Sequence, residues 1–175
     1  GGQIKTPTLS VLKLNKDNFV GGAGVVAQHL RSAGADVEFT TVVGDDDLKK
    51  FLFKTLKKNG VKLNPILDKT RPTTNKETII DENSGYRLLK IDTLDNSPIS
   101  NNLLDNILKN IKKIKSEINI FSDFRHGIFN KNSVDKLIQS IPKKNFKVAD
   151  SQVASRWGNI AEFKNKLRYI ANMPK

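Results

Sequence analysis

The sequence predicts an α/β fold, a three-layer parallel sheet flanked by helices with a small β lid. Apolar segments with strand character alternate with segments of helical periodicity along most of the chain. Short polar turns follow the predicted strands, at the edge where parallel sheets place their ligands. Two extended runs around a turn cluster interrupt this alternation and predict a hairpin beside the main sheet.

The chain has 175 residues, which is enough for one domain with a sizeable core. We therefore expect a single domain, 1–175. Residues 8–14 and 74–92 are predicted to form the β lid, and residues 19–68 and 95–175 the α/β core.

A small-residue stretch, Val20–Ala27, opens the first predicted helix. Gly21 and Gly22 precede apolar residues at helical spacing, so a ligand can approach the backbone N–H groups of the helix N-terminus. The same glycines also permit tight packing of loop and helix, and the spacing alone leaves both interpretations open. The next segment, Asp36–Val43, is rich in Val, Thr and Phe and predicts a buried strand that ends at Gly44.

A second helix is predicted over Asp46–Asn59, with an acidic first turn and with Gly60 as its left-handed cap. A short strand, Val61–Leu67, follows it. The lid hairpin is then predicted from the extended runs Lys76–Ile80 and Tyr86–Ile91. Residues 8–14 alternate apolar and polar side chains, so we expect them to add a third lid strand.

The second half of the chain repeats the alternation of helix and strand. Ser100 is expected to cap a helix whose apolar face extends to Ile114. The remaining predicted elements are a strand over 118–121, a helix over 133–141, a strand over 146–149, a helix over 159–166 and a short strand over 169–171.

Polar residues stand at the ends of four predicted strands, namely Gly44-Asp45, Asp123, Asp150 and Asn172. Because parallel strands end at one edge of their sheet, we expect these residues to line a ligand cleft. A carboxylate there can accept hydrogen bonds from the hydroxyls of a polyol, or hold Mg²⁺ through water. Helix capping is the better explanation for any one of these residues, but the convergence of several favours a cleft.

Three basic side chains are further candidates for ligand contact. His126 could contact a phosphate or a sugar, although a histidine before a glycine is as often a turn residue. Arg71 and Arg87 lie on the predicted lid and could pair with an anionic group of a substrate, although exposed arginines usually have no such role.

Composition excludes several classes of function. The net charge is +12, but the lysines occur in pairs on predicted helix surfaces, without interleaved aromatic residues, which favours solvated helix faces over nucleic-acid binding. No apolar run is long enough to span a membrane, and we expect no signal peptide, because no segment has its usual three-part form. The absence of cysteine excludes disulfides and favours the cytoplasm, and His29 and His126 lack metal-ligand spacing, so no metal site is predicted.

The motifs Gly21-Gly22-Ala23-Gly24 and Val42-Val43-Gly44-Asp45-Asp46 resemble the N-terminal signature of ribokinase-like (PfkB-type) carbohydrate kinases. Further segments are similar to the branch of that family that phosphorylates heptose phosphate in ADP-heptose synthesis. They are, in order, Arg71-Pro72-Thr73-Thr74, Arg87–Asp92, Phe121–Gly127, Asp150 at the branch's Asp-Pro-Lys segment and Asn172 at the first residue of its Asn-x-x-Glu motif.

This resemblance implies a parallel sheet with a lid over a sugar site, and transfer of the γ-phosphate of ATP to a sugar hydroxyl with Mg²⁺. The lid would exclude water during the transfer. By resemblance, the residues on the sugar side are Gly21, Gly22, Asp92, Asp123, His126 and Asp150, and Asn172 lies near the magnesium and the phosphates. No residue is assigned as catalytic, because the family's Gly-Ala-Gly-Asp motif is expected beyond residue 175.

The chain also departs from the family pattern. Val25 stands where the family has a sugar-contacting Asn, His126 replaces a Lys, and Ser151-Gln152 replaces Pro-Lys, which implies altered or lost sugar recognition. The family's opening strand is expected before residue 1. We therefore expect a fragment, or a degenerate relative, that is inactive as a kinase by itself. The alternative is a non-catalytic sugar- or nucleotide-binding module that dimerises through its lid strands.

Overall fold

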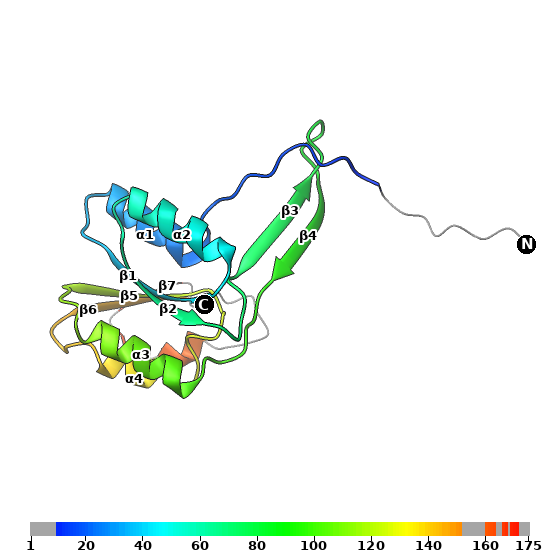
Figure 1. Cartoon of the computed structure of the whole chain (residues 1–175). Helices are drawn as coiled ribbons and strands as arrows, with labels where there is room; N and C mark the ends of the chain where they lie inside the picture. The colour runs from blue at the N-terminus through cyan, green and yellow to red at the C-terminus, as the bar shows by residue number, and fades with distance from the viewer. Residues whose placement is uncertain (1–9, 152–159, 164–165, 168, 172–175) are drawn as a thin grey trace, which may run out of the picture.

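The computed structural model describes residues 10–151, 160–163, 166–167 and 169–171. Parallel strands lie between helices α1 and α2 on one side and helices α3 and α4 on the other, and a hairpin projects from this core (Figure 1). In chain order the elements are α1 (Gly22–Ser32), β1 (Glu38–Gly44), α2 (Asp47–Lys58), β2 (Lys62–Asp68), β3 (Asn75–Ile80), β4 (Arg87–Thr93), α3 (Asn101–Ile111), β5 (Ile118–Asp123), α4 (Val134–Gln139), β6 (Phe146–Ser151), the 3₁₀ helix η1 (Ile160–Phe163) and β7 (Tyr169–Ala171).

Strands β1 and β2 pair in parallel along their whole length and are covered by helices on both faces. On one face, Phe39 of β1 packs with Leu56 of α2, whose side chain has no exposed surface. On the opposite face, Val42 and Ile66 pack into the core built with α3. The odd and even positions of each strand therefore face different helix layers, as in any sheet buried on both sides.

The local signals at the ends of the first helices are confirmed. Helix α1 begins directly after Gly21, and no side chain caps its N-terminus. Asp46 caps α2 by accepting a hydrogen bond from Lys49 N at 3.3 Å. Gly60 has a φ of +76°, the left-handed conformation expected at the C-terminal end of α2.

Strands β5, β6 and β7 form a second parallel sheet, with β6 in the centre. One face of this sheet packs against α3 and α4 through Phe121 and Ala149, and Phe163 of η1 closes the same core. Ile66 of β2 belongs to this core cluster as well. A single hydrophobic core therefore joins the two sheets on their α3–α4 side, although no hydrogen-bonded ladder between them is seen among the described residues.

The other face of the second sheet is largely open. Ile118, Ile120 and Phe146 alternate with the buried core residues of β5 and β6 and are 58%, 40% and 40% exposed. Helix α1 contacts both β1 and β5. The α1–α2 layer thus covers the first sheet and contacts the second sheet through β5.

The predicted lid hairpin is confirmed as an antiparallel pair, β3 and β4, with an irregularity between Ile79 and Ile80. Hereafter this hairpin is called the lid. Ile79 lies opposite Leu89 on one face, and Lys76 lies opposite Asp92 on the other. The lid therefore has one largely apolar face, on which Glu77 lies opposite Ile91, and one charged face.

The third lid strand expected over 8–14 is wrong for the described part of that segment. Residues 10–14 form no strand, and residues 8–9 lie outside the described residues. The segment runs beside the lid (Figure 1), and an ion pair of 3.0 Å between Lys16 and Glu77 connects the two. Alternating polarity permits a strand, but a strand also requires a hydrogen-bonded neighbour in register.

Two predicted helices are shorter in the structure. The helix after Ser100 ends at Ile111 rather than Ile114, and the helix predicted over 159–166 is the single 3₁₀ turn η1 within its described residues. After α3, the apolar periodicity continues beyond the last helical residue because Ile114 is also half-buried. The sequence pattern therefore does not mark where the helix ends. Among the described residues, no helix is both long and apolar enough to cross a membrane.

Candidate functional site

The loop after β5 brings two predicted site segments together. A Cβ atom placed on Gly22, at the start of α1, would lie 3.7 Å from the ring of Phe124. Two residues further along, half-buried His126 forms a hydrogen bond with Asn96, with Nδ1 and Oδ1 separated by 2.7 Å. The N-terminus of α1, the β5 loop and the segment after β4 therefore meet at the carboxyl end of the strands.

The protonation of His126 follows from its surroundings. Burial lowers its pKa below the usual 6.5, and the Lys76 charge lowers it further, against the opposing effect of Asp123 and Asp92. The ring is therefore neutral at pH 7. Because Asn96 Oδ1 can only accept, Nδ1 carries the proton, and Nε2 is left as an acceptor for a hydroxyl or an N–H group.

The charged face of the lid lies on the same side as His126. Lys76 and Asp92, which pair across the base of the hairpin, are the two lid residues whose charges act on the imidazole. Asp92 also lies 3.5 Å from Lys90 of the same strand. The predicted site residues Asp92 and His126 are thus brought into one neighbourhood, at the junction of lid and core.

Arg71, which was a candidate for an anionic substrate group, is occupied within the chain. Its Nε atom donates to Asp68 Oδ2 at 2.6 Å, and the two side chains are only 9% and 4% exposed. Its Nη1 atom donates to the carbonyl oxygens of Ser97 and His126 at 3.3 and 3.4 Å. Arg71 therefore fixes the end of β2 to the loop that holds His126.

Asp68 is held as a carboxylate by these contacts. Burial opposes its ionisation, but hydrogen bonds from the hydroxyl and backbone N–H of Thr70, together with Arg71, outweigh burial and hold the pKa of Asp68 below its usual range. Asp68 was not among the predicted site residues. An aspartate at the end of an apolar strand was its only signal.

The Gly44-Asp45-Asp46 segment serves the fold. Asp46 accepts a hydrogen bond from Thr73 N at 2.7 Å in addition to capping α2, and Gly44 N donates to Thr73 Oγ1 at 3.0 Å. A Cβ on Gly44 would lie 2.4 Å from Thr73 N, so only glycine allows the 71–74 segment to pack here. Asp45 pairs with Lys49 on the helix surface.

Asp123 is enclosed rather than open to a ligand. Its side chain is 2% exposed, Oδ1 accepts a hydrogen bond from Arg125 N at 2.8 Å, and Oδ2 accepts one from Ser151 Oγ at 2.8 Å. Asp150 is half-buried and lies on the opposite face of β6 from Ser151, toward the α1 layer. The structure therefore places Asp123 and Asp150 at one sheet edge but on opposite faces. Asn172 lies outside the described residues.

Glu162 of η1 adds an acidic group to this buried region. Burial raises the pKa of Glu162, Asp123 raises it further, and Arg125 opposes both. Its Oε2 atom is buried without a hydrogen-bond partner among the described residues. Sequence reasoning missed Glu162, Asn96 and Lys76, since each reaches the site only through folding and stands in no motif.

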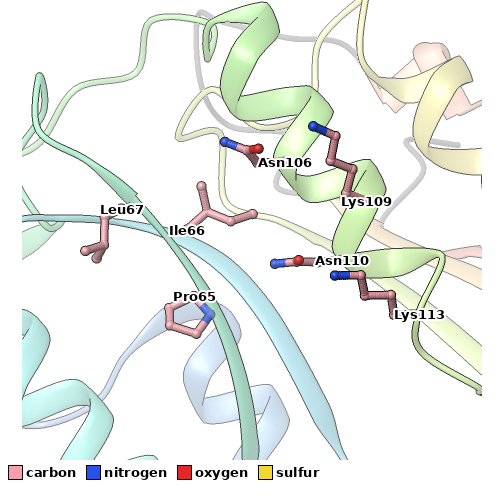
Figure 2. Close-up of a pocket in the computed structure, with 7 residues that line it drawn as sticks. All are labelled: Pro65, Ile66, Leu67, Asn106, Lys109, Asn110 and Lys113. Carbon is pink, nitrogen blue, oxygen red and sulfur yellow. The ribbon is translucent and has the colours of Figure 1, made fainter.

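An open hollow lies away from these residues. Figure 2 shows it between the outer edge of β2 and α3, lined by Pro65, Ile66, Leu67, Asn106, Lys109, Asn110 and Lys113. None of the predicted site residues lines it. Pro65 is compatible with this outer edge of β2, where no ladder hydrogen bond is needed.

Few side chains near the strand ends are available as ligands for a magnesium ion. In the part of the chain that the structure describes, no three His, Cys, Asp or Glu side chains are grouped to hold a metal ion. The carboxylates of Asp68 and Asp123 already have internal partners. Within the described residues, the carboxylates at the strand ends therefore form no preassembled cluster for a magnesium ion.

Comparisons with known proteins agree with this architecture. Residues 8–172 match the model of the pfkB family carbohydrate kinases. The chain is 36% identical over 129 residues to the bifunctional protein HldE of Helicobacter pylori and 33% identical over 130 residues to that of Rhodopseudomonas palustris, which covers 72% and 71% of this chain. It spans only 27% and 26% of those two proteins, about a quarter of their length.

Solved structures show the same fold at low identity. Phosphofructokinase-2 from Escherichia coli, in a tetrameric inhibited form, superposes with a TM-score of 0.59 at 19% identity over 75% of this chain and 43% of that one. Ribokinase from Giardia lamblia superposes with a TM-score of 0.56 at 11% identity over 82% and 48%. These similarities establish a ribokinase-like α/β fold with a lid. Together with the family match over almost the whole sequence, they show that this chain belongs to the pfkB family of carbohydrate kinases.

Proposed function

We propose that this chain forms the substrate-and-lid portion of a kinase that transfers the γ-phosphate of ATP to a hydroxyl of a sugar or sugar phosphate. One observation carries the proposal. The N-terminus of α1, the loop of Phe124 and His126, and the charged base of the lid meet at the carboxyl end of the parallel strands. That is where an α/β sheet binds its ligand.

In this proposal the side chains and backbone groups around the site bind the hydroxyls of the sugar. Nε2 of neutral His126 accepts a hydrogen bond from a sugar hydroxyl. Exposed Asp92 accepts hydroxyl hydrogen bonds from the lid side, and half-buried Asp150 does so from β6. Gly21 and Gly22 let the sugar approach the first turn of α1, where backbone N–H groups point outward. The lid would exclude water from the reacting phosphate.

ATP and Mg²⁺ are part of the proposal through the family alone. Asn172 remains the residue proposed to lie near them, and the catalytic base is proposed to lie outside these 175 residues. The absence of cysteine favours the cytoplasm as the compartment.

The decisive test is a γ-phosphate transfer assay. It uses Mg-ATP, the natural full-length protein that contains these residues, and a panel of hexoses, heptoses and their phosphates. Transfer to one panel member supports the proposal and names the acceptor. For that acceptor, His126→Ala should raise KM by about threefold to tenfold through loss of one hydrogen bond, with KM for ATP unchanged. His29→Ala is the matched control, because His29 is exposed on α1. No transfer to any panel member contradicts the kinase proposal.

A non-catalytic binding module that self-associates through the lid is the second candidate. The observation that favours it is the apolar lid face, where Leu89 and Ile91 are 54% and 45% exposed beside half-buried Ile79. Sedimentation analysis of the 175-residue chain should then show a dimer, and Leu89→Ser should shift it to monomer. Leu12→Ser, at an exposed position outside the lid, should leave the dimer intact. A monomer at all concentrations contradicts this candidate.

A further inference from the structure

The carboxylate of Asp123 is fully used inside the protein. Oδ1 accepts the backbone N–H of Arg125 at 2.8 Å. Oδ2 accepts the hydroxyl of Ser151 at 2.8 Å and lies 3.2 Å from Nη1 of Arg125. Asp123, Arg125 and Ser151 are 2%, 6% and 0% exposed, so no substrate atom can reach this carboxylate without displacing one of these partners.

The backbone at Arg125 is in a strained conformation. Its φ is +65°, and among the described residues it is the only non-glycine residue with a positive φ. Such a conformation is strained for a residue with a Cβ atom. The hydrogen bond and the ion pair from Asp123 act on this same residue and so offset the strain.

The left-handed turn determines where the neighbouring side chains go. Arg125 is buried, while the residues on either side of it, Phe124 and His126, are only half-buried. Phe124 lies against Gly22 and His126 against Asn96. Ordinary extended or helical backbone at Arg125 would change the direction of the chain and move both contacts.

The far end of the loop is fixed by different residues. Gly127 has a φ of +88°, and its carbonyl accepts a hydrogen bond at 3.1 Å from Ile99 N in the segment before α3. Arg71 donates to the carbonyl of His126 at 3.4 Å. His126 therefore lies between a glycine anchor on one side and the Asp123–Arg125 pair on the other.

From this geometry we infer that Asp123 is a positioning residue, which acts with Ser151 through Arg125 to set the turn that presents His126 to the ligand site. The sequence predicted that Asp123 contacts the substrate directly; in this inference Asp123 acts on the substrate only through the position of His126. Ser151 extends the arrangement to β6, so that the ends of two strands hold one loop. The inference rests on the proposed function only in giving His126 a ligand to meet.

The test follows the imidazole of His126 by NMR titration of the 175-residue chain. The chain has two histidines, so His29 is an internal reference in every spectrum. Four side chains act on the imidazole of His126. They are Lys76 and Asp92 from the lid, Asn96 from the segment after it, and Asp123 from β5. Ser151→Ala removes one partner of Asp123 without changing any charge, and Asp123→Asn removes the charge itself.

The two variants separate positioning from simple electrostatics. If Asp123 acted on His126 only through its charge, Asp123→Asn would lower the pKa of His126, because the carboxylate raises it now. If Asp123 holds the turn, both variants release His126 from its half-buried place, and its pKa rises toward 6.5. Asp105→Asn, at an exposed position of α3, should leave the titration unchanged.

A fall in the pKa of His126 in Asp123→Asn, combined with an unchanged titration in Ser151→Ala, would overturn the inference. Should Asp123→Asn fail to fold, as judged by circular dichroism, Ser151→Ala decides alone. The readout needs neither sugar nor ATP. A negative result in the phosphotransfer assay would therefore count against the proposed function and leave this inference standing.

Discussion

Helices bury both faces of β1 and β2, whereas the face of β5 and β6 that points away from α3 and α4 stays largely exposed, although α1 contacts β5. Both sheets contain large apolar strand residues. Phe39 is packed against α2, while Ile118 and Phe146 are 58% and 40% exposed. An apolar strand residue stabilises the fold only if a helix or another element covers its face of the sheet, because only then is its side chain buried. The first sheet and the shared core should carry most of the stability of this chain.

A polar connection joins the two sheets in addition to their common core. The Asp68–Arg71 pair closes the end of β2 and reaches the carbonyl oxygens of Ser97 and His126. At the end of β5, Asp123 and Arg125 form a second buried pair, which extends to β6 instead. Two strands therefore end in the same kind of pair, and the first pair links the two sheets.

The largest effect is expected for Arg71→Ala. It leaves the Asp68 carboxylate buried without its ion-pair partner and cuts both links to the second half, so the unfolding free energy should fall by about 3–5 kcal/mol. Urea unfolding at pH 7 measures this. Arg87→Ala, on the exposed lid strand, is the matched control and should cost less than about 0.5 kcal/mol. Equal effects of the two variants would show that the link between the sheets contributes nothing.

The comparison of the two sheets is tested by one truncation in each. Leu56→Ala removes a fully buried side chain from the covered face and should cost about 2–5 kcal/mol. Ile118→Ala removes a similar side chain from the open face, and should cost less than about 1 kcal/mol because the side chain is 58% exposed. The same urea series measures both. A large loss for Ile118→Ala would mean that this face is covered in solution.

The class of fold could be predicted from the sequence because its signals are local. Glycines, caps and apolar periodicity placed α1, α2 and the hairpin where the structure has them. The third lid strand failed because its alternation had no partner strand in register, which a local pattern cannot supply.

The candidate site was predicted less completely, for the same reason. His126 and Asp92 stood in recognisable segments, and the structure brings them together. Whether an aspartate at a strand end is open or enclosed depends on distant residues, as Ser151 shows for Asp123. Lys76 and Asn96 reach His126 only through the placement of the lid, so no sequence signal pointed to them.

Substitutions at two glycines with positive φ distinguish the cost of steric crowding from the cost of backbone strain. Gly127 has a φ of +88° and its Cβ would lie 2.0 Å from the Ser97 carbonyl oxygen, so Gly127→Ala should cost about 2–4 kcal/mol. Gly34 has a φ of +96° with nothing within 4 Å, so Gly34→Ala should cost only about 1–2 kcal/mol. Thermal unfolding of both variants gives the difference. If the losses are equal, the close approach at Gly127 does not contribute.

The smallest predicted effect is the loss of stability at low pH through Asp46, which follows the end of β1. Burial opposes the ionisation of Asp46, but hydrogen bonds from Thr73 and from the first turn of α2 outweigh burial and hold the pKa of Asp46 below its usual 3.8. A lowered pKa means that the native state binds fewer protons than the unfolded chain. The stabilisation is therefore complete above the unfolded pKa and is lost as the pH falls through the lower folded value.

Asp46→Asn keeps the shape and the ability to cap α2 but removes the charge, so it should cost about 1 kcal/mol at pH 7. That difference from the wild type should narrow as the pH falls below 4, because the wild-type carboxylate then loses its charge as well. Urea midpoints of both proteins between pH 7 and pH 3 measure the narrowing, with Asp105→Asn as an exposed control on α3. A constant difference across that range would assign the cost to hydrogen-bond geometry instead of charge. The acid response of the first sheet would then have to begin at Asp68, whose pKa is lowered by its own partners Thr70 and Arg71.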